Sequence, residues 1–225
     1  MSASIEVRNL TKVFNGSDKC FTALNGVSLT IEKGELVIIS GKSGSGKSTL
    51  LNMVSGIDSP TTGEVFVGKD PIHSFTSNQL ASWRGRNLGI VFQFFQLMPT
   101  LTVLENIMLP MEFASIIDRK DQKRRAMSLL EKVDIVDLAY KFPSSISGGE
   151  KQRVAIARSL ANNPRFIVAD EPTGNLDSTN TSIIHQLFNS LADEGKTIVY
   201  VTHEKDTALR YSRRIEMIDG NILNK

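Results

Sequence analysis

The feature that most constrains the fold of this chain is the segment Gly41–Ser48, which has the sequence GKSGSGKS. It fits the pattern G-x-x-x-x-G-K-[ST] of the phosphate-binding P-loop, which requires a strand before it and a helix after it. The apolar run Leu36–Ile39 is typical of a buried strand, and Thr49–Val54 is typical of the start of a helix. The segment therefore predicts a strand–loop–helix unit that holds a nucleoside triphosphate, without indicating what the energy is used for.

The rest of the chain alternates between strand and helix patterns. Half-buried strands are predicted where apolar and polar residues alternate, and central parallel strands where short runs are entirely apolar. Helical spacing occurs from about 101 to 138 and over 149–160, and the charged stretch 118–125 indicates a solvated face or a loop. The predicted strands are 5–10, 27–31, 64–67, 89–92, 166–169, 197–201 and a pair within 215–223. This order predicts an α/β fold with a parallel sheet.

Composition narrows the classes of protein that remain. The chain has 225 residues with 40% hydrophobic content, which is enough for one domain, or one domain with a subdomain. A net charge of +2 shows no strong basic field for nucleic acid. The single cysteine, Cys20, excludes an internal disulfide and is expected to be buried or half-buried. No secretory signal or spanning stretch of about 20 apolar residues is visible, so we expect a cytoplasmic protein that reaches a membrane only through a partner.

The P-loop residues have distinct expected roles. The glycines let backbone N–H groups turn toward the phosphates, and the helix N-terminus adds partial positive charge. Lys47 is expected to reach the β- and γ-phosphates, the Ser48 hydroxyl to bind Mg²⁺, and Thr49 to support the α-phosphate side. The expected ATP contacts in this loop are Gly41, Ser43, Gly44, Ser45, Gly46, Lys47, Ser48 and Thr49.

Two carboxylates follow the predicted central strand 166–169. A carboxylate at the carboxyl end of such a strand lies beside the P-loop, where Asp170 could hold Mg²⁺ through its water shell. Glu171, one residue further, could polarise the attacking water as a general base. The alternative is an ordinary strand end whose charges face solvent, and the P-loop in the same chain favours the catalytic interpretation.

A second candidate anion site is Ser147-Gly148-Gly149-Glu150 at the start of the predicted helix 149–160. A helix N-terminus with small residues can hold a phosphate group. Serine is also a good N-cap with no ligand at all, so the pattern alone is weak. Two phosphate cradles in one small domain suggest that the second serves the nucleotide of another chain.

Taken in order, these motifs resemble the nucleotide-binding domain of ATP-binding cassette (ABC) proteins over essentially the whole chain. The signature motif continues as Arg153-Val154-Ala155-Ile156-Ala157-Arg158, with Ile146 and Glu150 where leucine and glutamine are common. The resemblance implies a P-loop NTPase (RecA-like) core at about 1–92 and 160–225. It also implies an N-terminal antiparallel β subdomain and an inserted α-helical subdomain at about 93–159.

The resemblance also implies a head-to-tail homodimer that sandwiches two ATP molecules. Ser147, Gly148, Gly149 and Glu150 of one chain would then complete the γ-phosphate site of the other, with Asp177 at the interface. It implies an ATPase in which Lys47, Glu171 and His203 are catalytic, although a lone histidine is more often structural.

Two further residues take their roles from the resemblance. Phe14 matches the position that stacks on adenine, and the alternative is a core or edge phenylalanine. Gln93 would bind Mg²⁺ together with Ser48 and Asp170, and would sense a membrane partner.

The segments Asn87–Pro99 and Leu101–Pro110 are similar to lipoprotein-release and macrolide-export ATPases of the LolD/MacB type, and the bacitracin-resistance type of peptide-export ATPase is a close relative of these. The resemblance implies export, or transmission of mechanical force across the membrane, as the activity. That subfamily implies a permease with an extracytoplasmic domain and a place at the cytoplasmic face of the membrane. A groove for the permease is expected near Phe94, Phe95, Leu97 and Met98, unless some of these belong to the core. The alternatives are a cell-division ATPase of the FtsE type or an amino-acid-importer ATPase. A soluble ABC protein acting on nucleic acid is disfavoured because no coiled-coil insertion, zinc module or basic stripe is present in the sequence.

Overall fold

The computed structural model describes residues 5–16, 20–204 and 207–223. A three-stranded antiparallel sheet has the order β2-β1-β4, with β1 at Ile5–Asn15, β2 at Cys20–Ile31 and β4 at Thr62–Val67. Both β1 and β2 extend beyond the alternating segments that predicted them, because the two strands continue as a hairpin as far as the pair Asn15 and Cys20.

The second sheet has six strands in the order β5-β6-β7-β3-β8-β9. Its neighbours are parallel except for the antiparallel pair β8 and β9, which confirms the predicted parallel sheet. The strands are β3 (Leu36–Ser40), β5 (Leu88–Val91), β6 (Phe166–Asp170), β7 (Thr197–Thr202), β8 (Arg213–Ile218) and β9 (Asn221–Leu223).

The central strands separate two hydrophobic clusters. Leu36 and Ile38 of β3 face a cluster shared with the large helices, whereas Val37 and Ile39 face a cluster shared with the three-stranded sheet. Successive side chains of a strand point to opposite faces, so a strand covered on both faces is apolar throughout. This explains why the central strands carry runs of apolar residues rather than alternation.

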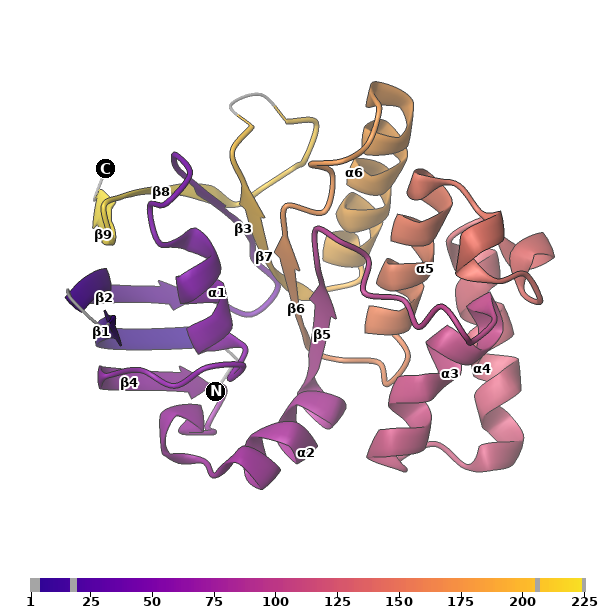
Figure 1. The fold of residues 1–225 in the computed structure, drawn as a ribbon, viewed down its shortest axis with the longest axis horizontal. Helices are drawn as coiled ribbons and strands as arrows, with labels where there is room; N and C mark the ends of the chain where they lie inside the picture. Colours follow the sequence, from indigo (N-terminus) through magenta and orange to yellow (C-terminus); the bar gives the residue numbers. More distant parts are fainter. Residues whose placement is uncertain (1–4, 17–19, 205–206, 224–225) are drawn as a thin grey trace.

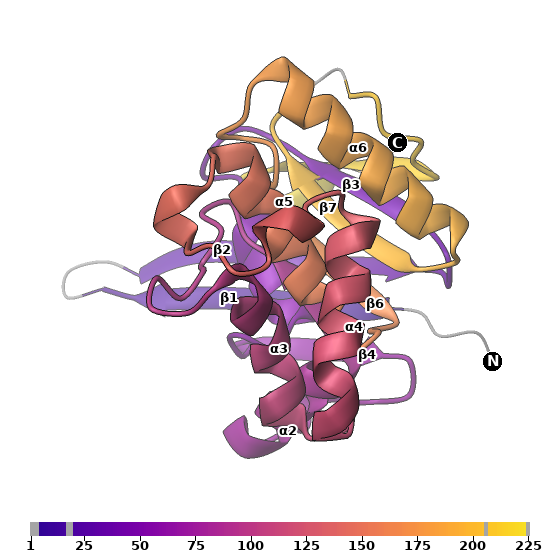
Figure 2. The ribbon, with the colours of Figure 1, turned by 90° about the vertical axis from the view of Figure 1, so that its right-hand side faces the viewer.

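The helices fill both sides of the six-stranded sheet. Helix α1 (Lys47–Val54) lies between the two sheets, and α2 (Ser77–Asn87) leads into β5 (Figure 1). The other helices, α3 (Val103–Ala114), α4 (Arg119–Lys132), α5 (Gly148–Ser159) and α6 (Ser178–Asp193), gather on the opposite side (Figure 2). Single 3₁₀ turns occur at Ile72–Ser74, Val136–Leu138 and Pro143–Ser145.

The predicted helical region from 101 to 138 is divided into α3 and α4. Ser115 adopts a left-handed conformation with φ of 51° and ends α3, and α4 begins after Asp118. Helix α3 starts at a capping box in which Thr102 Oγ1 accepts from Glu105 N and the Glu105 carboxylate accepts from Thr102 N. The charged stretch 118–125 forms the start of α4, with Asp118 at the N-cap position without a side-chain capping bond and with Gln122 buried.

Cys20 is exposed at the start of β2, so the expectation of a buried or half-buried cysteine was wrong. None of the helices in the described ranges is long and apolar enough to cross a membrane. The division of the chain at about residues 93 and 159 stays a prediction, although α3, α4 and α5 do form a compact group of helices (Figure 2).

Candidate nucleotide-binding site

The P-loop connects β3 to α1 in a conformation that needs glycine. Gly46 has φ of 97°, and a Cβ there would lie 2.5 Å from the carbonyl oxygen of Ala23. Gly46 is also the N-cap of α1, and no side chain of the described residues caps this helix end. The first N–H groups of α1 therefore face the loop without a side-chain acceptor, an arrangement suited to phosphate oxygens.

Lys47 and Ser45 present polar groups within this loop. Lys47 is buried, and its Nζ donates to the carbonyl oxygens of Gly41 and Lys42, both at 2.9 Å. The hydroxyl of Ser45 is buried and has no hydrogen-bond partner among the described residues. Buried polar groups are normally satisfied, so this unpaired hydroxyl is an exception within the loop.

Asp170 ends β6 directly opposite the P-loop helix. The Ser48 hydroxyl donates to Asp170 Oδ1 at 3.2 Å, joining residues 122 positions apart. Burial raises the pKa of the Asp170 carboxyl, the Ser48 hydrogen bond opposes this shift, and the neighbouring Glu171 adds to it. A hydroxyl and a carboxylate oxygen are hard ligands of the kind that Mg²⁺ prefers.

Glu171 and His203 meet at the same sheet edge. They follow the neighbouring parallel strands β6 and β7, and His203 Nδ1 lies 3.1 Å from Glu171 Oε2. Glu171 has φ of 44°, and its N–H donates to Val201 O at 3.0 Å. A left-handed conformation is costly for glutamate, and such strain is concentrated at functional sites. The Glu171 backbone is therefore held in an unfavourable conformation, and the carboxylate of this residue lies against His203.

One cavity of about 490 Å³ brings many of the expected residues together. Its lining residues are Ser43–Thr49 of the P-loop together with Gln93, Asp170, Glu171, Phe21 and Ala23. The phosphate-binding loop, the carboxylate that faces Ser48 and the strained glutamate thus share one space. This arrangement suits a nucleoside triphosphate and a bound water close to its terminal phosphate.

The Ser147–Glu150 motif lies outside that cavity, at the N-terminus of α5. Ser147 and Glu150 form a capping box, in which the Glu150 carboxylate accepts from Ser147 N at 2.6 Å. These hydrogen bonds lower the pKa of Glu150. Ser147 therefore does act as an N-cap within the single chain. The anion-binding role of this motif stays a prediction.

Asp177 lies close to this motif through Asn180. Asp177 is the N-cap of α6, where it accepts from Asn180 N at 2.8 Å, and this bond lowers its pKa. A Cβ on Gly149 would lie 2.0 Å from Asn180 Oδ1, so Gly149 permits close packing of α5 against α6. Gly148 differs, because a Cβ there would meet, among the described residues, only the Phe95 ring at 4.0 Å.

Residues 24–174 match the family described as ABC transporter. The chain belongs to the ABC transporter family. A lipoprotein-releasing system ATP-binding protein, LolD of Aquifex aeolicus, is 43% identical over 100% of this chain and 98% of its own length.

Solved structures of ABC cassettes agree with this assignment. A dimeric ATP-binding cassette in a post-hydrolysis state, bound to ADP and Pi, is 40% identical, has a TM-score of 0.91, and covers 98% of this chain and 97% of its own. A cassette from Clostridium perfringens that is part of an ABC transporter complex is 30% identical, has a TM-score of 0.86, and covers 100% and 88%. The chain is thus an ABC ATPase of the LolD type with the predicted P-loop NTPase fold.

In this ABC cassette, the aromatic residue that lines the P-loop cavity is Phe21 rather than Phe14. Phe14 on β1 lies opposite Phe21 on β2. The side chain of Phe14 is 44% exposed, and that of Phe21 is 60% exposed. Lys12 Nζ lies 5.0 Å from the centroid of the Phe14 ring. The adenine contact of Phe14 stays a prediction. Phe21 was missed because its place opposite Phe14 depends on the register of a hairpin that is not visible in the sequence.

Gln93 lines the cavity of the cassette and begins the loop toward α3. Asn175 Nδ2 donates to Gln93 O at 3.3 Å, and a Cβ on Gly174 would lie 3.2 Å from Gln93 Nε2. Of the apolar residues that follow, Phe94 and Met98 are 66% and 46% exposed, whereas Leu97 packs against the helical core. The expected groove residues therefore separate into exposed and core positions.

Proposed function

We propose that this chain is the ATP-hydrolysing subunit of a membrane transporter complex and acts as a homodimer with two ATP molecules between its protomers. The observation that carries the proposal is the division of the site. The P-loop, Asp170 and Glu171 share one cavity, whereas Ser147–Glu150 lies outside it. A second copy of the chain would bring the missing motif to each cavity.

The two signature glycines support this arrangement. Gly149 is required by packing within the chain, because Asn180 occupies the space of a side chain. Gly148 has room for a side chain, so its small size serves something outside the protomer, and a phosphate group of the partner's nucleotide is the ligand that a helix N-terminus would accept. The dimeric form of the solved ABC cassette agrees with this role.

Magnesium fits the polar groups of the cavity. Ser48, Asp170 and Gln93 would hold Mg²⁺ together with the phosphate oxygens, and the ion would supply positive charge next to the phosphates. The hydroxyl, amide and carboxylate oxygens of this set match the preference of the ion for oxygen ligands.

The remaining chemistry belongs to side chains of the cassette. Lys47 would exchange its two backbone carbonyl partners for phosphate oxygens and stabilise negative charge there. Glu171 would orient the attacking water and accept its proton, while His203 would hold the Glu171 carboxylate in place and contact the γ-phosphate. Phe14 would stack on adenine. These roles describe in-line attack of water on the terminal phosphate.

The membrane partner is proposed from the relatives. The similar protein from Aquifex aeolicus is named as part of a lipoprotein-releasing system, and the cassette from Clostridium perfringens is part of a transporter complex. By analogy, this chain would bind permease subunits with an extracytoplasmic domain at the cytoplasmic face of the membrane. Its action would be export or force transmission of the lipoprotein-release type.

The test is the variant Glu171→Gln, which keeps the size of the side chain but removes the base. Steady-state ATP hydrolysis should fall by about 10²- to 10⁴-fold. ATP-bound dimers should accumulate, measured by size-exclusion chromatography with light scattering. Asp193→Asn is the matched control, because this exposed carboxylate pairs with Arg210 on the surface. Full turnover in Glu171→Gln would refute the assigned role.

A further inference from the structure

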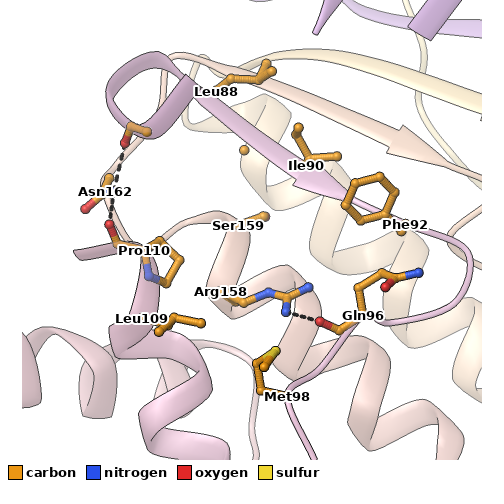
Figure 3. A pocket seen from close by; sticks show the side chains of 12 residues that line it. Leu88, Ile90, Phe92, Gln96, Met98, Leu109, Pro110, Arg158, Ser159 and Asn162 are labelled. Atoms are coloured by element: carbon orange, nitrogen blue, oxygen red, sulfur yellow. Dashed lines mark hydrogen bonds between the residues drawn. The ribbon is translucent and has the colours of Figure 1, made fainter. Parts of the chain in front are cut away.

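The loop that follows Gln93 is held by an arginine from α5, which is the signature helix. Arg158 lies in the last turn of α5, whose N-terminus carries Ser147 and the two glycines. Its Nη2 donates to Phe95 O at 2.7 Å. Its Nη1 donates to Gln96 O at 2.5 Å, a bond drawn in Figure 3. A guanidinium presents several donors in a fixed planar arrangement, so one side chain can hold two successive carbonyls.

The backbone of this loop would not adopt its conformation readily without support. Phe95 and Gln96 have φ of 27° and 52°, in the left-handed region that is unfavourable for residues other than glycine. Such conformations persist where the surroundings determine them. The carbonyls that Arg158 holds belong to these same two residues, so the arginine stabilises the strained part of the loop.

Arg158 is also unusual in its charge balance. None of the described carboxylates lies within ion-pair distance of it, and burial lowers its pKa. A partly buried charge with no opposite charge is costly unless hydrogen bonds compensate. The loop carbonyls supply this compensation, so the same two hydrogen bonds stabilise both the buried arginine and the loop.

Other side chains fix the two ends of the loop. Asn175 Nδ2 donates to Gln93 O, and the buried Asn106 accepts from Met98 N at 2.8 Å and donates to Met98 O at 3.1 Å. Between these ends, Arg158 connects the middle of the loop to α5. It also points into a cavity of about 350 Å³ that is lined by Phe92, Gln96, Met98, Leu109 and Pro110 (Figure 3).

We infer that Arg158 is a positioning residue that connects the Gln93 loop to the signature helix, so that the loop and the Ser147–Gly149 motif move together. A displacement of Gln93 in the nucleotide cavity would pull the Phe95 and Gln96 carbonyls and hence the C-terminal end of α5. The helix has 12 residues and a length of about 18 Å, so it would carry the motion to its N-terminus. This inference rests on the proposed function, in which both motifs act on ATP.

The experiment compares Arg158→Gln and Arg158→Lys with a matched control, Arg125→Gln. Arg125 of α4 also donates to two backbone carbonyls at the C-terminal end of α5, those of Leu160 and Ala161, but these lie outside the Gln93 loop. If Arg158 only stabilised the structure around the C-terminal end of α5, Arg158→Gln and Arg125→Gln would therefore have similar effects. All variants are made in the full chain, and thermal unfolding is measured for each.

The first readout is amide hydrogen exchange of residues 94–98 without nucleotide, which does not depend on turnover. Exchange should rise in Arg158→Gln by about tenfold over Arg125→Gln, because local opening becomes easier. Equal exchange in the two variants would overturn the inference. Wild-type ATP turnover tests the proposed function separately, so the two ideas can fail independently.

The second readout is the split between kcat and KM for ATP. Arg158 lies outside the P-loop cavity, so Arg158→Gln should change KM for ATP only slightly. It should lower kcat by about tenfold, because the lost contact matters in the closed, ATP-bound dimer in which hydrolysis takes place. Arg158→Lys keeps the charge but not the planar arrangement of donors, and it should restore part of kcat. Should Arg158→Gln fail to fold, Arg158→Lys decides alone: a kcat equal to that of wild type would overturn the inference.

Discussion

The hydroxyl of Ser48 donates a hydrogen bond to Oδ1 of Asp170 at 3.2 Å, and this contact joins the first turn of α1 to the end of β6. The two residues belong to different motifs that are far apart in the sequence. Their contact places a hydroxyl and a carboxylate where the phosphates of a nucleotide bound in the P-loop would end. It is therefore the structural basis for expecting Mg²⁺ at this point.

Removing the Ser48 hydroxyl should strongly slow magnesium-supported hydrolysis. Ser48→Ala should lower kcat by about a hundredfold or more, since metal charge stabilisation contributes several kcal/mol. Ser48→Thr keeps the hydroxyl and is allowed by the motif, so it should retain activity. Steady-state phosphate release over a range of Mg²⁺ concentrations measures both variants. Equal activity of the alanine and threonine variants would show that the hydroxyl has no role.

The two signature glycines should respond differently to the same substitution. Gly149→Ala places a Cβ 2.0 Å from Asn180 Oδ1 and should reduce the free energy of unfolding by about 1–3 kcal/mol. Gly148→Ala meets little within the protomer and should change it by less than about 0.5 kcal/mol.

ATP hydrolysis should nevertheless fall by about tenfold or more in Gly148→Ala, because the added methyl group would obstruct a phosphate of the other protomer. Chemical denaturation and ATPase assays on both variants check this pair. A stable Gly148→Ala variant with normal hydrolysis and normal ATP-dependent dimerisation would contradict the two-protomer site.

The adenine base of the nucleotide should stack on an aromatic side chain of the hairpin formed by β1 and β2. Phe21 lines the P-loop cavity and Phe14 is its cross-strand neighbour, so replacing each with alanine tests which ring stacks on adenine. Loss of a stacking contact of about 0.5–1.5 kcal/mol should weaken ATP binding by about two- to tenfold. Titration with a fluorescent ATP analogue measures the affinity. A loss confined to Phe21→Ala would transfer the adenine role from Phe14 to Phe21.

Much of the nucleotide site could be predicted because its groups occupy fixed positions in short motifs. Asp170 and Glu171 stand at the end of a strand that an apolar run reveals, and Lys47 and Ser48 follow another such strand at the fixed spacing of the P-loop motif. Parallel strands bring their carboxyl ends to one edge, so the meeting of these residues follows from fold class alone.

The features that were missed depend on contacts between distant residues. Asn180 against Gly149, Phe21 in the cavity and Arg158 on the Phe95 and Gln96 carbonyls are set by helix packing and hairpin register. The positive φ of Glu171 is likewise invisible in a sequence, because glutamate does not favour it. Periodicity shows which side of an element is buried but not which residue lies across from it.

Stability should depend on pH through His185, which is buried on α6. Its ring lies beside Tyr200, with centroids 6.1 Å apart, and Nε2 is 3.4 Å from Thr207 Oγ1. Burial lowers the pKa of His185, and Glu204 opposes this shift. The folded state therefore binds the proton less readily than the unfolded state, whose histidine has a pKa of about 6.5.

With the pKa lowered on folding, the unfolded state gains a proton first as pH falls, so the free energy of unfolding should decrease below about pH 6.5. His185→Gln removes this titration. The variant should be less stable than wild type at about pH 7.5, because it loses packing against Tyr200, and the gap should narrow at about pH 5.5. Urea denaturation at the two pH values and constant ionic strength measures the gap. A gap that stays constant or widens on acidification would show that His185 is protonated at least as easily in the folded protein as in the unfolded chain.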